Sequence, residues 1–92
     1  LLITLDTVRA DRIGAYGGRV AATPTLDALA RDGIRFEHAF TPVPLTLPAH
    51  ATLLTGLQPP GHGLTDNGMR ATRFPVATLA ERLRAEGYDT AA

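Results

Sequence analysis

The chain contains no cysteine, no lysine and no tryptophan. Without cysteine it can form neither disulfides nor thiolate metal sites within these 92 residues. Its formal net charge is zero, so it lacks the basic surface typical of proteins that bind nucleic acid or anionic membranes. Its longest apolar runs are far too short to cross a bilayer, so the sequence offers no membrane segment.

Hydrophobic residues make up 45% of the chain and charged residues 20%, which is typical of a globular protein. The sequence opens on the apolar run Leu1–Leu5 without a methionine and stops soon after Asp89. We therefore expect a fragment cut at both ends, with no domain boundary within 1–92, that does not fold well alone. A leader could precede it, so localisation stays open, as does the oligomeric state.

Apolar patterning and helix-end signals predict an α/β domain with a mostly parallel sheet flanked by helices. The expected elements are strands over 1–5, 34–40 and 88–92 and helices over 24–31, 49–55 and 76–86. Thr23 with Pro24 is typical of a capped helix start, and Gly33, Gly56 and Gly87 of helix ends. We expect loops over 6–22 and 57–75.

Asp6 follows the first expected strand. Ligands of open α/β sheets bind outside the carboxyl ends of the strands, where a carboxylate can hold a divalent cation. An aspartate at the end of a strand is more often a turn or N-cap residue. The residue alone leaves both interpretations open.

Thr46 precedes a stretch of good helix-forming residues that Pro48 helps to start and Gly56 ends. The free N–H groups at a helix N-terminus favour a bound anion, so a hydroxyl there could attack a phosphoryl or sulfuryl centre. A plain N-cap role for the Thr46 side chain is the alternative.

Several blocks, in order and at matching spacing, closely resemble the start of bacterial proteins of the sulfatase family. They cover residues 3–12, 23–36, 41–56 and 79–88. The resemblance implies an alkaline-phosphatase-like α/β fold, with 1–92 as the N-terminal part of the catalytic domain. It further implies a metal-dependent hydrolase of sulfate or phosphate esters, acting on a small-molecule, glycan or lipid ester.

The family places a metal ligand at the position of Asp6 and its nucleophile at the position of Thr46. We therefore expect Asp6 and Thr46 to bind a divalent ion, which could be calcium, manganese or zinc. The next family position is often a second acidic ligand, but here it is Thr7. Asp11 lies nearby, and we expect it to be a solvated loop residue paired with Arg9 or Arg12.

Two further departures bear on the chemistry. The family signature has cysteine or serine, any residue, proline, a small residue and then arginine, whereas this chain has Thr46 and His50 at the first and last positions. Oxidation of threonine would give a ketone instead of the aldehyde, formylglycine, that classical sulfatases use. Thr46 should therefore act unmodified, as in related threonine-nucleophile enzymes, and this favours phosphate esters.

The histidines and one asparagine are weaker site residues. His50 is either a catalytic residue or packs on the helix face, one turn from Thr46. We expect His38 to pack or face water and His62 to shape a loop. Asn67 lies in a turn signal, Asp66-Asn67-Gly68, that borders the active-site cleft in similar proteins.

Two other functions fit the sequence. The departures at Thr7 and His50 favour a catalytically inactive binding protein with the sulfatase fold. A membrane-anchored transferase of phosphoethanolamine or glycerol phosphate is the other, if apolar segments precede this chain. A dinucleotide-binding domain is disfavoured because Gly14, Gly17 and Gly18 do not form the required motif between strand and helix.

Overall fold

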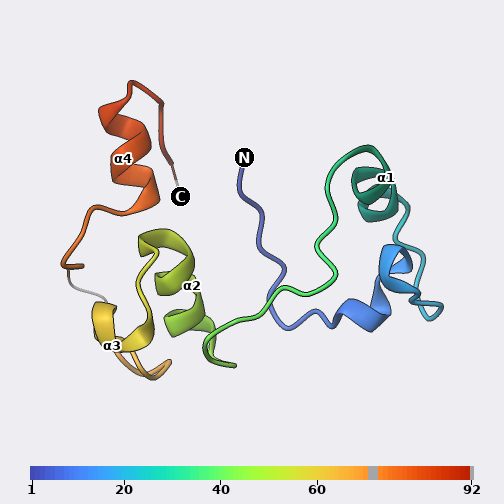
Figure 1. Ribbon diagram of the computed structural model, residues 1–92, viewed down its shortest axis with the longest axis horizontal. Coiled ribbons are helices and arrows are strands. Elements are labelled where there is room, and N and C mark those ends of the chain that lie inside the picture. The colour runs from blue at the N-terminus through green and yellow to red at the C-terminus, as the bar shows by residue number, and fades with distance from the viewer. Residues whose placement is uncertain (71–72, 92) are drawn as a thin grey trace. The chain divides into compact units, whose positions relative to one another are not determined.

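The computed structural model describes residues 1–70 and 73–91 as helices joined by extended and irregular segments (Figure 1). The elements are the 3-10 helices η1 (Ala10–Arg12) and η2 (Gly14–Tyr16) and the α-helices α1 (Pro24–Asp32), α2 (Thr46–Thr55), α3 (Pro59–His62) and α4 (Leu79–Ala85). The chain divides into two units, Leu1–Ala39 and Phe40–Ala92.

The expected parallel sheet does not form: no residue in 1–70 or 73–91 belongs to a β-strand. The segments 1–5, 34–40 and 88–91 lack secondary structure, and residue 92 lies outside the described residues. A strand needs a neighbour to satisfy its backbone groups, and none of these segments pairs with another. Their apolar side chains face solvent, with Ile34 86% and Phe40 90% exposed, as expected of strands without a sheet.

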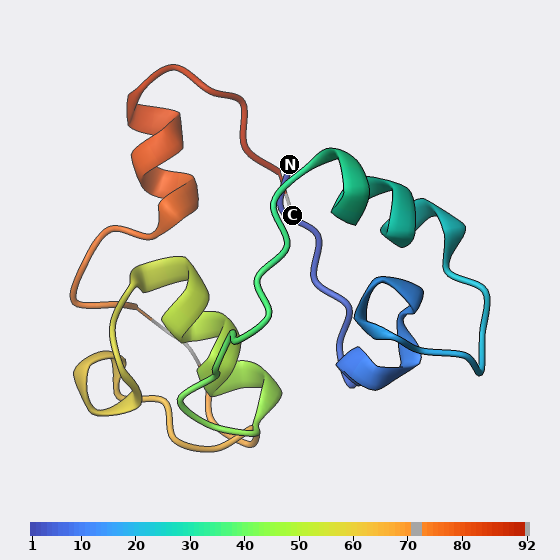
Figure 2. The ribbon, with the colours of Figure 1, turned by 45° about the vertical axis from the view of Figure 1, so that its right-hand side comes forward.

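The first unit is organised by the start of α1, which packs against η2 (Figure 2). Thr23 precedes the helix as expected, but its hydroxyl does not cap it. The Thr23 hydroxyl accepts the Gly14 N–H (2.8 Å) and donates to Asp27 (3.0 Å), which also accepts the Ala15 N–H (2.7 Å). A Cβ at Gly14 would lie 2.5 Å from a carboxylate oxygen of Asp27, so this close approach requires glycine.

The second unit contains the buried residues of the described chain, and they gather where α3 packs against α2 (Figure 1). They are Pro48 and Ala51 from α2, Pro59 and His62 from α3, and Leu64. Helix α2 begins three residues before the expected start and ends at Gly56, whose φ of 73° suits glycine. This small core fixes the place of α2 in the unit.

His62 links α2 to the chain that follows α3. It is buried, and its Nδ1 accepts the Leu64 N–H (3.1 Å) while its Nε2 lies 3.1 Å from the Thr52 hydroxyl. Since Nδ1 accepts, neutral His62 carries its proton on Nε2 and donates to Thr52. The expectation of a loop over 57–75 was wrong at 59–62, where the two prolines begin a short helix, but His62 does order the adjoining chain.

Helix α4 starts three residues after the expected position because Thr78 caps it. The Thr78 side chain accepts the Glu81 N–H, and the Glu81 carboxylate accepts the Thr78 N–H (2.7 Å) and hydroxyl (2.8 Å). These hydrogen bonds to the charged form lower the pKa of Glu81 below its usual value. Their stabilisation is therefore present at neutral pH and is lost as the pH falls through this lowered pKa.

The cap of α4 generates a testable prediction. Thr78→Ala removes the acceptor of the Glu81 N–H and should lower the free energy of unfolding of the full-length protein by about 1 kcal/mol. Thr78→Ser keeps the hydroxyl and serves as the control. Chemical denaturation measures both variants, and equal stability of Thr78→Ala and the unsubstituted protein would contradict the capping role.

Candidate functional site

Thr46 is the first residue of α2, and its side chain is exposed. The N-cap position belongs to Leu45, so the interpretation of Thr46 as an N-cap residue was wrong. Pro48 falls within the first turn, where a missing N–H breaks no intrahelical hydrogen bond. Because Leu45 has no side-chain acceptor, the N–H groups of this turn need partners from elsewhere in the chain.

Asn67 provides one of these partners. Its Oδ1 accepts the Leu47 N–H at 2.9 Å, across twenty positions of sequence. Asp66 forms the expected turn by accepting the Gly68 N–H at 2.8 Å. The sequence placed Asn67 in a turn near the site, but the contact with Leu47 depends on tertiary structure and left no sequence signal.

His50 lies one turn after Thr46 and contacts it through the backbone. Its Nδ1 is 2.8 Å from the Thr46 carbonyl oxygen. A carbonyl can only accept, so the hydrogen-bond pattern assigns a proton to Nδ1. The expectation that the two residues share a helix face is confirmed, and this hydrogen bond orients the imidazole ring.

Thr46, Leu47, His50 and Asn67 together line an open depression of about 360 Å³. The second unit thus gathers both catalytic residues expected from the sequence, with Asn67 added. The depression holds a hydroxyl, an imidazole and an amide beside a helix N-terminus, a combination suited to an anionic ester.

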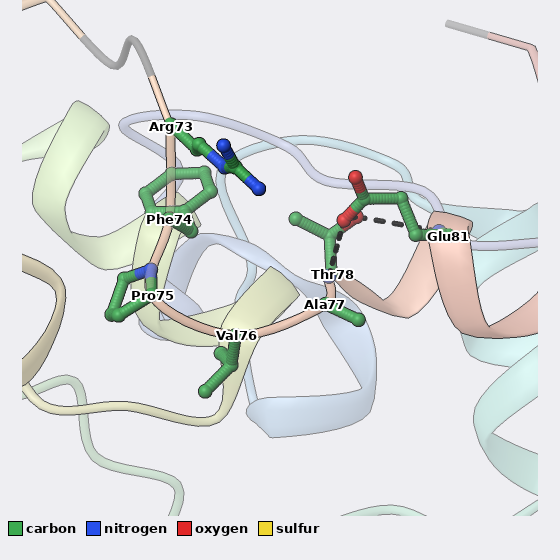
Figure 3. Close-up of a pocket in the computed structure, with 7 residues that line it drawn as sticks. All are labelled: Arg73, Phe74, Pro75, Val76, Ala77, Thr78 and Glu81. Carbon is green, nitrogen blue, oxygen red and sulfur yellow. Dashed lines mark hydrogen bonds between the residues drawn. The ribbon is translucent and has the colours of Figure 1, made fainter.

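A second cavity, of about 550 Å³, is formed by the segment before α4 and its first turn (Figure 3). It is lined by Arg73, Phe74, Pro75, Val76, Ala77, Thr78 and Glu81. The cavity contains none of the expected site residues, and its Glu81 carboxylate is engaged with Thr78 in the helix cap. We therefore assign this cavity no catalytic role.

Asp6 belongs to the first unit and is exposed. Its Oδ1 accepts the N–H of Thr7 at 3.0 Å. Thr7 has a φ of 58°, a left-handed conformation that is strained for a β-branched residue. Asp6 and Thr7 form a turn, so the expected turn role of Asp6 is confirmed, and its role as a metal ligand stays a prediction.

The described residues fit a divalent ion only in part. The carboxylate of Asp6 is a suitable oxygen ligand for a hard cation, which requires several such ligands. Residues 1–70 and 73–91 contain no group of three or more histidine, cysteine, aspartate or glutamate side chains that could hold a metal ion. This part of the chain therefore supplies at most a portion of a ligand set.

Asp11 is not a second ligand beside Asp6. Its carboxylate pairs with the Arg9 guanidinium at 2.7 Å, and both side chains are exposed. The hydrogen bond from Arg9 lowers the pKa of Asp11 below its usual value. The expected exposure and arginine pairing are confirmed, but the expected loop over 6–22 is wrong here, because Asp11 lies in the 3-10 helix η1.

The sequence matches the sulfatase family over residues 1–92. It is 34% identical to steryl-sulfatase of Mus musculus over 99% of this chain, 40% identical to arylsulfatase A of Bos taurus over 98%, and 36% identical to an ulvan-active sulfatase of Formosa agariphila over 97%. The chain spans only 16%, 19% and 17% of the lengths of these relatives. No solved structure matches it.

The relatives are named as sulfatases, which are ester hydrolases, and their family typically uses a divalent metal ion. The fold of the sulfatase family is the alkaline-phosphatase-like α/β fold. The described residues of this chain form helices and no strands. Among those residues no helix is long and apolar enough to cross a membrane. The match extends from the first residue to the last, and the chain therefore belongs to the sulfatase family, in the N-terminal region of an alkaline phosphatase superfamily protein.

Proposed function

We propose that the protein carrying this chain is a metal-dependent hydrolase of phosphate or sulfate esters in which Thr46 is an unmodified nucleophile. Residues 1–92 form the N-terminal part of its catalytic domain. The observation that supports this most strongly is the place of Thr46 at the exposed start of α2, beside His50 and Asn67, in a chain of the sulfatase family.

The lack of cysteine and serine in these 92 residues agrees with an unmodified threonine. Neither cysteine nor serine, the precursors of formylglycine, occurs anywhere in the 92 residues. In the proposed reaction the Thr46 hydroxyl loses its proton to solvent as its Oγ bonds to phosphorus, the ester P–O bond breaks, and the leaving alkoxide takes a proton from solvent to become an alcohol. Water then attacks phosphorus and releases phosphate from Thr46.

This chemistry favours phosphate esters over sulfate esters. A phosphorylated threonine is cleared by attack of water at phosphorus. A sulfated threonine cannot release sulfate by the route that formylglycine uses, in which the hydrate of the aldehyde expels sulfate by C–O cleavage. The relatives' names point to sulfate esters, so the identity of the nucleophile argues for a change of substrate within the family.

The metal site is proposed from the family match and the chemistry of Asp6. The Asp6 carboxylate and the Thr46 hydroxyl would hold a divalent ion, calcium, manganese or zinc, together with ligands from beyond this chain. A bound ion would favour the ionised hydroxyl and neutralise charge on the ester. The N–H groups at the start of α2 would orient the anionic oxygens of the substrate.

A catalytically inactive binding protein with the same fold is a second candidate function. His50 stands where the family has arginine, and its Nδ1 donates to the Thr46 carbonyl. An imidazole lacks the permanent charge and forked donors with which arginine binds anions. A protein that binds an anionic ester without turning it over would fit this arrangement.

The nucleophile generates the first functional prediction. Thr46→Ala in the full-length protein should lower kcat by roughly 10³-fold or more even at a saturating concentration of the divalent ion, because it removes the nucleophile as well as one ligand of the ion. Thr46→Ser keeps a hydroxyl and should retain measurable turnover. Steady-state kinetics on a phosphate ester provide the readout.

Thr41→Ala is the matched control, because Thr41 is an exposed threonine of the same unit whose hydroxyl donates only to the Val43 carbonyl in the described hydrogen bonds. It should retain full activity. Unchanged activity of Thr46→Ala would remove Thr46 from the mechanism, and an inactive parent protein that still binds the ester would favour the binding function.

The metal ligand generates a second prediction. Asp6→Asn keeps the oxygen that accepts the Thr7 N–H but removes the charge, so it should weaken binding of the divalent ion by roughly tenfold or more. Asp11→Asn is the control, since Asp11 is paired with Arg9. Elemental analysis after dialysis measures the retained metal, and equal metal content in both variants would contradict the role of Asp6.

A further inference from the structure

The peptide unit that follows Thr46 is held at both of its polar ends. Its carbonyl oxygen, from Thr46, accepts the His50 Nδ1–H at 2.8 Å. Its N–H, from Leu47, donates to Asn67 Oδ1 at 2.9 Å. Because this peptide is attached directly to the Cα of Thr46, fixing its plane restricts how the Thr46 side chain is presented.

We propose that Asn67 is a positioning residue for the nucleophile: it caps α2 from outside the helix and so fixes the backbone of Thr46. The inference rests on the proposed function. It assigns Asn67 a role through Leu47 and requires no contact between Asn67 and the substrate.

The helix needs such an external cap. Residues that cap helix N-termini carry a side-chain oxygen, and Leu45 at this position has none. The amide oxygen of Asn67 takes over that task for the Leu47 N–H, the second residue of the helix. An N-cap side chain normally reaches an N–H of this same turn.

The segment that carries Asn67 is itself ordered. Leu64, just before it, is buried with 5% of its surface exposed. Asp66 then closes a turn by accepting the Gly68 N–H, and the Thr65 N–H points to the sulfur of Met69 at 3.3 Å. Asn67 therefore reaches α2 from a turn that local hydrogen bonds and a buried leucine hold in place.

The choice of asparagine also suits the proposed substrate. Aspartate caps a helix as well as asparagine does, but it adds a negative charge. The charge would lie in the depression shared with Thr46, where an anionic ester would bind. A neutral amide supplies the acceptor without repelling the anion, so capping and substrate binding are compatible at Asn67.

The test compares variants that keep or remove the acceptor in the full-length protein. Asn67→Leu has a similar volume but no acceptor. It should speed amide hydrogen exchange at Leu47 by about fivefold, which is the change in the local opening equilibrium expected when a helix loses its N-terminal cap. It should also lower kcat by about tenfold with KM within about twofold, the pattern of lost transition-state alignment.

Asn67→Asp keeps the acceptor, so it should retain slow exchange at Leu47 and a kcat within about threefold, while KM for an anionic ester rises. Thr41→Ala is the control, because the Thr41 hydroxyl donates to the Val43 carbonyl and not to the Asn67 turn, and this variant should leave exchange, kcat and KM unchanged. Asn67→Ala is a second acceptor-free variant, which separates loss of the cap from any strain that a leucine introduces.

Three results would overturn the inference. They are unchanged Leu47 exchange in both acceptor-free variants, faster exchange with unchanged kcat, or an effect confined to KM, which would indicate direct contact with the substrate. The exchange readout does not depend on turnover. Full activity of Thr46→Ala would therefore refute the proposed nucleophile, while the Leu47 exchange would still report whether Asn67 caps α2.

Discussion

The hydrogen bonds at the Thr46–Leu47 peptide are the constraint on which the site depends. The Thr46 carbonyl accepts a hydrogen bond from His50 and the Leu47 N–H donates to Asn67, so one peptide joins the proposed nucleophile, a neighbouring imidazole and a turn twenty residues away. The core formed by α2 and α3 also restrains this peptide, because Pro48, which follows Leu47, is fully buried in that core. The backbone of the exposed residue Thr46 is thus restrained by hydrogen bonds and packing with the surrounding residues.

The proposed nucleophile, Thr46, would separate this chain from the chemistry for which its family is named. The family model covers all 92 residues, and the relatives are sulfatases. The resemblance to the family puts Thr46 at the nucleophile position, where a threonine cannot give the aldehyde of formylglycine, and puts His50 where the family has arginine. Both changes lie in one helical turn of α2, so the site differs from the family pattern as a unit. The proposed phosphoryl transfer would account for the change at Thr46, whereas the change at His50 also fits the binding function.

Local signals predicted more of this structure than long-range ones did. The start of α1 at Pro24 and the end of α2 at Gly56 follow from proline and glycine positions, which act within one turn, whereas α2 begins three residues before the expected start. The expected parallel strands are not formed in the described part of the chain. A strand must pair with a neighbouring strand, and a local sequence pattern does not show whether that neighbour is present. In the site, the spacing of Thr46 and His50 predicted their contact. The cap from Asn67 could not be predicted, because it depends on how a distant turn packs against α2.

Relative turnover of sulfate and phosphate esters tests the unmodified nucleophile most directly. The measurement compares hydrolysis of p-nitrophenyl sulfate, p-nitrophenyl phosphate and its phosphodiester by the full-length, metal-reconstituted protein. If Thr46 attacks as an unmodified hydroxyl, turnover of a phosphate ester should far exceed that of the sulfate. Dominant turnover of the sulfate would contradict phosphoryl transfer by Thr46 and return the protein to the chemistry for which its relatives are named.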